Sequence, residues 1–68
     1  MPWDQLHYPA AMKNLAPAVR SKAIEIANAL LAEGCDEGKA IRIALTMAGR
    51  WAQRSGISPE QELENHGR

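Results

Sequence analysis

The segment EGCDEG, residues 33–38, separates two runs of sequence whose apolar residues recur at helical spacing. Gly34 is typical of the position just past a helix C-terminus, and Asp36 is suited to capping the next helix because its carboxylate accepts from free backbone N–H groups. We therefore predict an all-α chain built as a helical hairpin, with helices at 17–33 and 36–55. The two helices are expected to pack in an antiparallel or an orthogonal arrangement.

The first run opens at Pro17, whose fixed φ suits the first position of a helix. At about 100° per residue, its apolar side chains collect on one side of the predicted helix and its polar side chains on the other. The apolar side contains Val19, Ala23, Ile26, Ala27, Leu30 and Leu31, with Ile24 at its flank. The polar side, which is expected to face solvent, contains Ser21, Lys22, Glu25, Asn28 and Glu33.

An N-terminal arm, residues 1–16, precedes the hairpin and carries two of the three aromatic residues, Trp3 and Tyr8. Because these are large apolar groups for so short a chain, the arm is expected to fold back across both helices. Pro9 is suited to opening one short helical turn within the arm. The arm and the hairpin together form a predicted single small domain, residues 1–56.

The C-terminal segment, residues 57–68, is predicted to be a short turn followed by a flexible acidic tail. Ser58, Pro59 and Gln61 match a helix-start signal, so residues 58–64 are a candidate for a short C-terminal helical turn. A single apolar side chain follows that signal, so the turn would have little to bury.

The predicted core draws on the arm and on both helices. Its members are Trp3, Leu15, Val19, Ile26, Ala27, Leu30, Ile41, Ala44, Ala48 and Trp51. Gly49 interrupts the second helix at a cost of roughly 1 kcal/mol relative to alanine. Close packing against a neighbour such as the arm is the expected reason for this glycine.

Size and composition limit how the chain can be stabilised. With 68 residues, one cysteine and two histidines, it has no second cysteine for a disulfide bond and too few ligands for a structural zinc site. No apolar stretch approaches the roughly 18 residues needed to cross a bilayer, and the N-terminus lacks the pattern of a signal peptide. These features predict a cytoplasmic protein with no metal and no cofactor, in which Cys35 is reduced.

No catalytic motif is recognisable, because the GxSxG, P-loop, dinucleotide-binding and zinc-protease patterns are all absent from the sequence. A thiolate nucleophile at Cys35 would need a nearby histidine, whereas His7 and His66 lie in the arm and the tail. Packing against Leu30 is the expected role of Cys35. We therefore expect a protein that is not an enzyme.

The second predicted helix has a basic side, and no acidic residue lies between Lys39 and Arg54. This side is either a solvated face or a face that meets phosphates, as the second helix of a helix-turn-helix protein does. The formal net charge of the chain is zero, which argues against a protein that depends on a phosphate backbone. Nucleic acid is therefore the alternative partner, not the expected one.

The apolar side of the same helix covers an arc of about 200°, whereas a core-facing helix needs a stripe of roughly 100°. Either the first helix and the arm cover the excess, or it forms a surface for a second copy of the chain or another partner, with Ile43 and Met47 at its edge. The candidate partner-binding residues are Lys39, Arg42, Ile43, Met47, Arg50 and Arg54.

Four segments occur in order within residues 1–52, followed by a late Trp-Ala pair: MPW, YPAAMKNL, VRSKAIEIANALLAEG and DEGKAIRIA. This ordered set resembles the N-terminal part of the YdaT-type proteins, which are uncharacterised bacterial proteins associated with general stress regulons. A more distant resemblance is to ChaB-type cation-transport regulators, which share an Asn inside the first helix and a late Ala-Trp pair. The YdaT-type resemblance implies a bacterial cytoplasmic setting and carries no catalytic residue over.

The expected function is a small regulatory or protein-interaction module, with a stress link implied by the resemblance. Its partner would be another protein or a second copy of the chain. The alternative is weak binding of nucleic acid through the basic side of the second helix.

Overall fold

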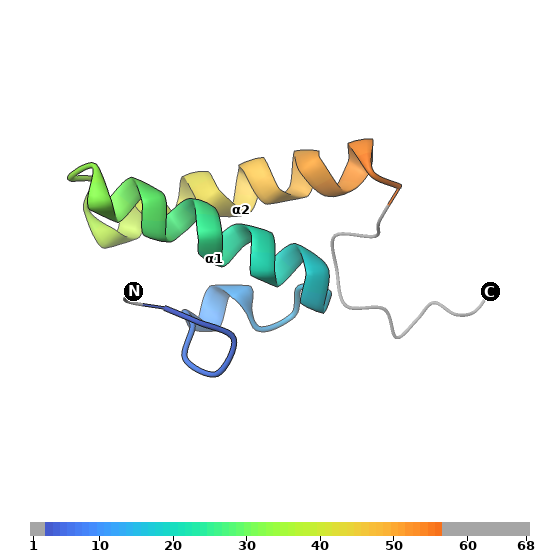
Figure 1. Cartoon of the computed structure of the whole chain (residues 1–68), viewed down its shortest axis with the longest axis horizontal. Helices are drawn as coiled ribbons and strands as arrows, with labels where there is room; N and C mark the ends of the chain where they lie inside the picture. Colours follow the sequence, from blue (N-terminus) through green and yellow to red (C-terminus); the bar gives the residue numbers. More distant parts are fainter. Residues whose placement is uncertain (1–2, 57–68) are drawn as a thin grey trace.

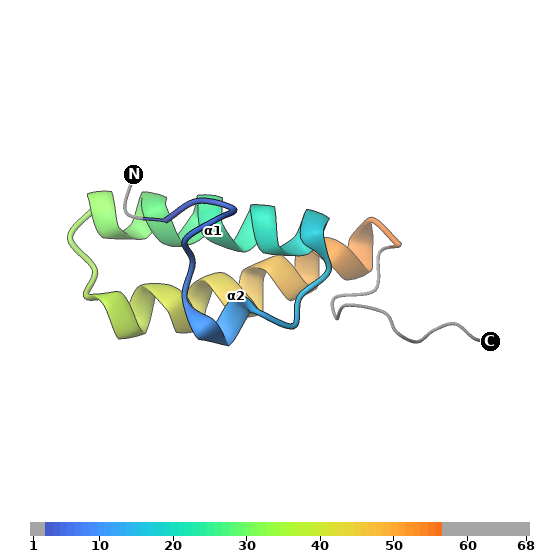
Figure 2. The same cartoon turned by 90° about the horizontal axis from the view of Figure 1, so that it is seen from below.

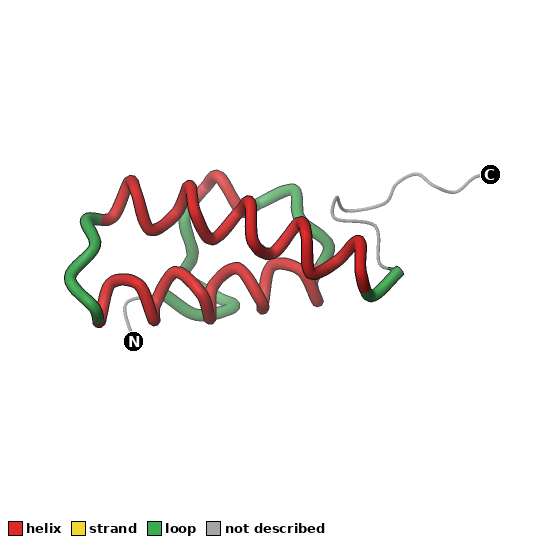
Figure 3. The backbone as a smooth tube through the Cα atoms, turned by 90° about the horizontal axis from the view of Figure 1, so that it is seen from above, coloured by secondary structure: helices red, strands yellow, loops and turns green. Residues whose placement is uncertain are grey.

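The computed structural model describes residues 3–56 and confirms the all-α helical hairpin (Figure 1). Helix α1 spans Pro17–Ala32, helix α2 spans Glu37–Arg54, and a single turn of 3-10 helix, η1, spans Ala10–Met12. Helices α1 and α2 lie side by side and antiparallel, which selects one of the two predicted arrangements (Figures 2 and 3). The predicted turn and tail at 57–68 lie outside the described residues.

The connection between the helices has the capping geometry that its sequence indicates. Gly34 has a φ of +101°, and its N–H donates to the carbonyl of Leu31 at 3.0 Å, which satisfies a carbonyl at the end of α1. Asp36 Oδ1 accepts from the N–H of Lys39 at 2.9 Å and so caps the start of α2. The predicted helix bounds differ from the observed bounds only by the capping positions.

The two helices meet along small side chains. Fully buried alanines recur at every fourth position of α2: Ala40, Ala44, Ala48 and Ala52. Helix α1 contributes Val19, Ala23 and Ala27, which are buried to the same extent. We call these seven residues the alanine seam. Because the seam is made of small groups, the two backbones can approach closely, and larger apolar side chains pack around its margin.

The arm crosses one face of the hairpin, as predicted (Figure 2). Met12 of η1 is fully buried in the core, and Trp3, Tyr8 and Leu15 are half-buried and pack against it. The arm thus contributes the large side chains that the alanine seam lacks.

Arg20 of α1 fastens the C-terminal end of the arm. Its guanidinium carbon lies 4.7 Å from the centroid of the Tyr8 ring, within the range of a cation–π contact. Its Nη1 donates to the backbone carbonyls of Lys13 at 3.1 Å and Leu15 at 3.3 Å. One side chain therefore holds three residues of the arm.

Most of the predicted core is observed. The fully buried members are Val19, Ala27, Ala44 and Ala48. The members that are half-buried against the core cluster are Trp3, Leu15, Ile26, Ile41 and Trp51. The prediction for Leu30 is wrong, because Leu30 is half-buried and lies outside that cluster.

The buried side of α1 is also broader than predicted. Ile24, expected only at the flank, is 6% exposed, and Asn28, expected in solvent, is 5% exposed. The physical reason is the arm, since the side chain of Asn28 forms hydrogen bonds with the backbone of Trp3. Helix α1 therefore buries one side against α2 and a second side against the arm.

The explanation predicted for Gly49 is wrong as well. A Cβ added at Gly49 would have no neighbouring atom within 4 Å, so no close packing requires a glycine there. The remaining cost of Gly49 is the conformational freedom that it gives the unfolded chain.

Candidate interaction surface on helix α2

The side of α2 opposite the alanine seam carries the candidate partner-binding residues. Five of the six are exposed, including all four basic ones: Lys39, Arg42, Met47, Arg50 and Arg54. Met47 is 49% exposed, and Ile43 beside it is half-buried. One predicted outcome was that α1 and the arm cover the whole of the wide apolar side of α2. That outcome is wrong, because Met47 remains exposed.

A shallow hollow of about 270 Å³ lies on this side of α2 and is lined by Arg42, Ile43, Thr46 and Met47. We call it the α2 hollow. It brings together three of the predicted residues and adds Thr46, whereas the other three basic residues lie outside it. These four positions fall on two adjacent turns of one helix, so the helix itself places them together.

The two polar side chains of the α2 hollow, Arg42 and Thr46, differ in their contacts. The hydroxyl of Thr46 donates to the carbonyl of Arg42 at 3.3 Å, so it is engaged by the backbone of its own helix. The guanidinium of Arg42 is exposed and supplies the only charge among the lining residues. The hollow is therefore an apolar surface with one cation at its edge.

The basic side chains of α2 form no ion pair with an acid among residues 3–56. In that part of the chain, Lys22 and Glu25 form an ion pair at 3.7 Å, and His7 Nδ1 lies 3.5 Å from Asp4 Oδ1, a contact that is an ion pair only when the imidazole is protonated. The positive field of α2 extends over about 8–10 Å at physiological salt. It is therefore a local feature of a chain whose formal net charge is zero.

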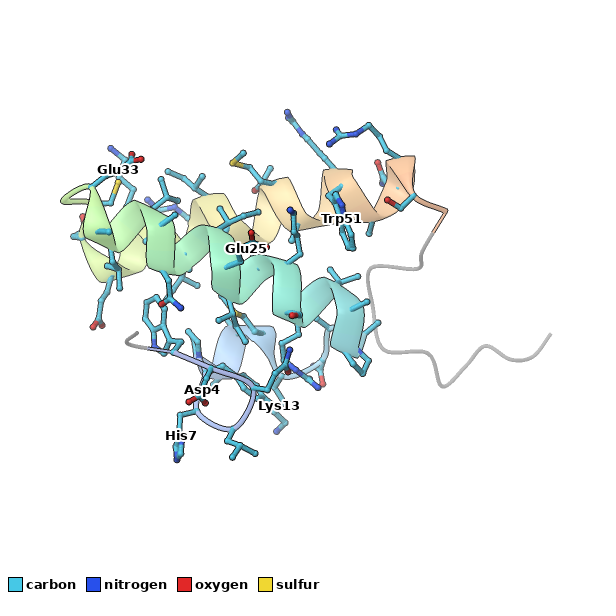
Figure 4. The ribbon with its side chains drawn as sticks, in the orientation of Figure 1. Asp4, His7, Lys13, Glu25, Glu33 and Trp51 are labelled. Atoms are coloured by element: carbon cyan, nitrogen blue, oxygen red, sulfur yellow. The ribbon has the colours of Figure 1, made fainter. Side chains whose placement is uncertain are left out.

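The structure shows a second exposed apolar feature, which the sequence reasoning missed. Asp4 Oδ1 accepts from the N–H groups of Leu6 at 2.9 Å and His7 at 2.8 Å, and the N–H of Asp4 donates to the carbonyl of His7 at 2.8 Å. These bonds close a tight turn at residues 4–7, which we call the arm turn (Figure 4). Leu6 at this turn is 84% exposed. An aspartate that bonds backbone groups two and three residues ahead is a recognisable turn signal.

The arm turn also fixes the charge beside Leu6. The hydrogen bonds from the backbone of His7 and of Leu6 lower the pKa of the Asp4 carboxyl below its ordinary value of 3.8. Asp4 is therefore negatively charged at neutral pH. Its contact with the His7 imidazole is exposed on both sides and contributes little to stability.

A larger hollow, of about 510 Å³, lies where the arm meets α1. It is lined by Trp3, Asp4, Gln5, Ser21, Ile24, Glu25 and Asn28. Two carboxylates belong to it, Asp4 on the arm and Glu25 on α1 (Figure 4). Across the described range, no three His, Cys, Asp or Glu side chains are grouped so that they could hold a metal ion. Because this hollow depends on the path of the arm, helical periodicity could not predict it.

Neither α1 nor α2 is long and apolar enough to span a bilayer. Cys35, in the connection between them, is a half-buried free thiol.

Comparison with known proteins identifies one curated relative. No protein-family model and no solved structure matches the chain. The chain is similar to the uncharacterized protein YdaT of Bacillus subtilis (strain 168), with 46% identity over 66 residues. The match covers 97% of this chain and 44% of YdaT, so the chain spans less than half the length of that relative. The comparisons lend no support to the ChaB-type resemblance. The YdaT-type resemblance is confirmed, because nearly the whole of this chain is similar to a part of that bacterial protein.

Proposed function

We propose that this protein is a non-enzymatic interaction module that binds another polypeptide through the α2 hollow. The observation that carries this proposal is the exposure of Met47 beside Arg42 on a helix face that neither α1 nor the arm covers. Methionine and arginine are both enriched at protein interfaces relative to the rest of the surface. Met47 has a flexible, polarizable side chain that can adapt to the shape of a partner.

The chemistry of the hollow specifies what kind of partner it fits. The apolar lining of Ile43 and Met47 suits an aliphatic side chain. Arg42 at its edge suits a carboxylate, which it can bind with two parallel hydrogen bonds. The partner segment should therefore carry an aliphatic residue next to an acidic residue.

Site-specific photo-crosslinking in the native cell tests this proposal. A photoreactive amino acid at Met47 should capture a recurring polypeptide, because that side chain lies at the centre of the proposed contact. The matched control carries the same photoreactive group at Ala29, which is exposed on α1. Equal capture from both positions, or no capture from Met47, would contradict the proposal.

The charge of the hollow allows a second comparison in the same experiment. Arg42→Glu in the Met47-labelled protein should remove the captured product, because a carboxylate of the partner would then meet a like charge. Lys13→Glu makes the same change of charge at an exposed position of the arm and should leave the product in place. The comparison separates a specific contact from a general effect of net charge.

The cellular setting is part of the same proposal. The single cysteine, Cys35, supports a cytoplasmic location, because reducing compartments keep thiols free. The stress-linked regulatory role follows from the YdaT-type resemblance and predicts that the cellular level of the protein rises under general stress.

A second candidate function is weak binding of nucleic acid. It is supported by the four exposed basic side chains of α2, none of which pairs with an acid in the described part of the chain. If these residues neutralise phosphates, the logarithm of the affinity for duplex DNA should fall with the logarithm of the salt concentration. The expected slope is about −0.9 for each phosphate neutralised. Binding that is absent or independent of salt for DNA, RNA and heparin would remove this candidate.

A further inference from the structure

We infer that the partner of the α2 hollow is a second copy of this chain, which inserts Leu6 of its arm turn into the hollow. The inference rests on the proposed function, because it names the polypeptide that the hollow binds. Such self-association requires that each chain present both a projecting aliphatic side chain and a recess that accepts this side chain from another copy.

The exposed apolar surface of the protein has these two parts. Among residues 3–56, the large hydrophobic side chains that are exposed are Leu6, at 84%, and Met47, at 49%. Leu6 projects from a turn, and Met47 lines a recess. Contact between them would remove both from water, which is the general driving force for association of apolar surfaces.

The charges next to these residues are complementary. Asp4, in the same turn as Leu6, has a side chain that is 65% exposed and carries a negative charge at neutral pH. Arg42 lies in the wall of the α2 hollow. Leu6 in the hollow of another copy would bring a carboxylate to a guanidinium, which is the aliphatic and acidic pair that the hollow fits. Copies do not repel one another, because the chain has no formal net charge.

The arm turn is already in a defined shape before any contact. Four hydrogen bonds join residues within it: Asp4 Oδ1 accepts two, and two more link the backbones of Asp4 and His7. A segment that is ordered in advance loses less conformational entropy when it binds. Leu6 is thus held out toward solvent by a preformed turn rather than by a loose loop.

The arm turn and the α2 hollow cannot meet within one molecule. The arm turn lies at the bottom of Figure 1, and α2 runs along the top, with α1 between them. The association is therefore head-to-tail, with the arm turn of one copy on the hollow of the next. A head-to-tail contact leaves one free surface of each kind at the ends, so the assembly grows unless it closes into a ring.

Sedimentation velocity of the full chain and of surface variants tests this arrangement. For the wild type, the average mass should rise with concentration over a roughly thousandfold range, which spans micromolar to millimolar Kd values. Leu6→Asp removes the projecting side chain, and Met47→Glu places a charge in the recess. Each variant alone should remain a monomer. Both positions are exposed, so the folded state should be retained in circular dichroism.

An equimolar mixture of the two variants gives the sharpest result. Leu6→Asp keeps an intact hollow, and Met47→Glu keeps an intact arm turn, so one productive contact forms between them. The mixture should therefore form a dimer that cannot grow further. Gln5→Asp and Gln53→Glu add the same charge to the arm turn and to α2 at exposed positions, and these controls should assemble as the wild type does.

Three outcomes would overturn the inference. The first is a wild type that remains a monomer over the whole concentration range. The second is a Leu6→Asp variant that assembles normally, which would indicate a symmetric contact between hollows. The third is a variant mixture that stays monomeric. The proposed function is judged separately by the crosslinked product from Met47. A product that contains a different polypeptide sustains the function and overturns only self-association, whereas no product contradicts both.

Discussion

Trp3 and Asn28, which are 25 residues apart in the chain, are joined by two hydrogen bonds. The Asn28 Nδ2 donates to the carbonyl of Trp3 at 3.0 Å, and the N–H of Trp3 donates to Asn28 Oδ1 at 3.3 Å. The side-chain amide thus pairs with a backbone peptide as another peptide group would. Together with Arg20 at the other end, it attaches the arm to α1 at two points on either side of the arm turn.

Asn28→Ala should lower the free energy of unfolding by about 1–3 kcal/mol, because the backbone groups of Trp3 would lose their buried partners. Urea titration followed by tryptophan fluorescence measures this change. Asn14→Ala, at an exposed position of the arm, is the matched control and should change stability by less than about 0.5 kcal/mol. Equal effects of the two substitutions would mean that the arm is not anchored at Asn28.

Acid should loosen the arm turn before it affects the hairpin. The pKa of Asp4 is lowered in the folded protein, so its stabilising effect is complete above the ordinary value of 3.8 and is lost as the pH falls through the lower folded-state pKa. Amide resonances of Leu6 and His7 should shift together with a midpoint below 3.8. Asp4→Asn keeps an acceptor oxygen but does not titrate, so it should abolish this shift. A midpoint at or above 3.8 in the wild type would contradict the assignment.

Two glycines should respond to alanine with opposite signs. Gly49→Ala should raise the free energy of unfolding by up to ~1 kcal/mol, because the added methyl meets no atom within 4 Å and the unfolded chain loses freedom. Gly34→Ala should lower it by about 1 kcal/mol, because the φ of +101° is strained for any residue with a Cβ. Thermal melts should separate the two variants by several degrees, at about 4–8 °C per kcal/mol for a domain of this size. Destabilisation by Gly49→Ala would show that α2 has a neighbour at that position.

The alanine seam should reject larger side chains. Ala48→Leu should lower the free energy of unfolding by about 1–3 kcal/mol, because Ala48 is fully buried where the two helices approach each other. Ala29→Leu, on the exposed side of α1, is the control and should stay within about 0.5 kcal/mol of the wild type. Chemical denaturation of both variants checks this. Tolerance of leucine at Ala48 would indicate that the helices are farther apart than the structure shows.

Truncating a side chain on the arm-facing side of α1 should lower the free energy of unfolding more than truncating one near the C-terminal end of α1. Ile24→Ala should lower the free energy of unfolding by ~2–5 kcal/mol, since Ile24 is 6% exposed within the core cluster. Leu30→Ala should cost less, because Leu30 is half-buried and outside that cluster. Urea titrations of the two variants rank them directly. The reverse order would restore the original prediction that Leu30 belongs to the core.

The hairpin could be predicted because its determinants are local. The glycine at position 34 and the cap at Asp36 act on backbone groups within a few residues, and the periodicity of each run selects its own buried side. Asn28 was misplaced because polarity alone assigns an amide to solvent, whereas its partner is a backbone group 25 residues away. The choice between Ile24 and Leu30 likewise depended on the path of the arm.

The candidate surface was predictable to a similar degree. Helical periodicity placed Arg42, Ile43 and Met47 on neighbouring parts of α2, where the structure has the hollow. The same periodicity puts Thr46 on the basic side with Arg42, but it could not show that these positions line an open hollow. Leu6 was missed because its exposure depends on the hydrogen bonds of one turn, and an isolated leucine in an arm has no periodic pattern to mark its side.

The alanine seam also bears on how the chain folds during its synthesis. A ribosome releases the N-terminus first, at about 5–20 residues per second. Trp3 is therefore made before Asn28, and Asn28 before Ala52, which completes the seam. For a few seconds the nascent arm and α1 expose apolar side chains whose partners do not yet exist. The arm and the hairpin must therefore complete their fold as one unit once α2 has been made, because none of the earlier segments has a core of its own.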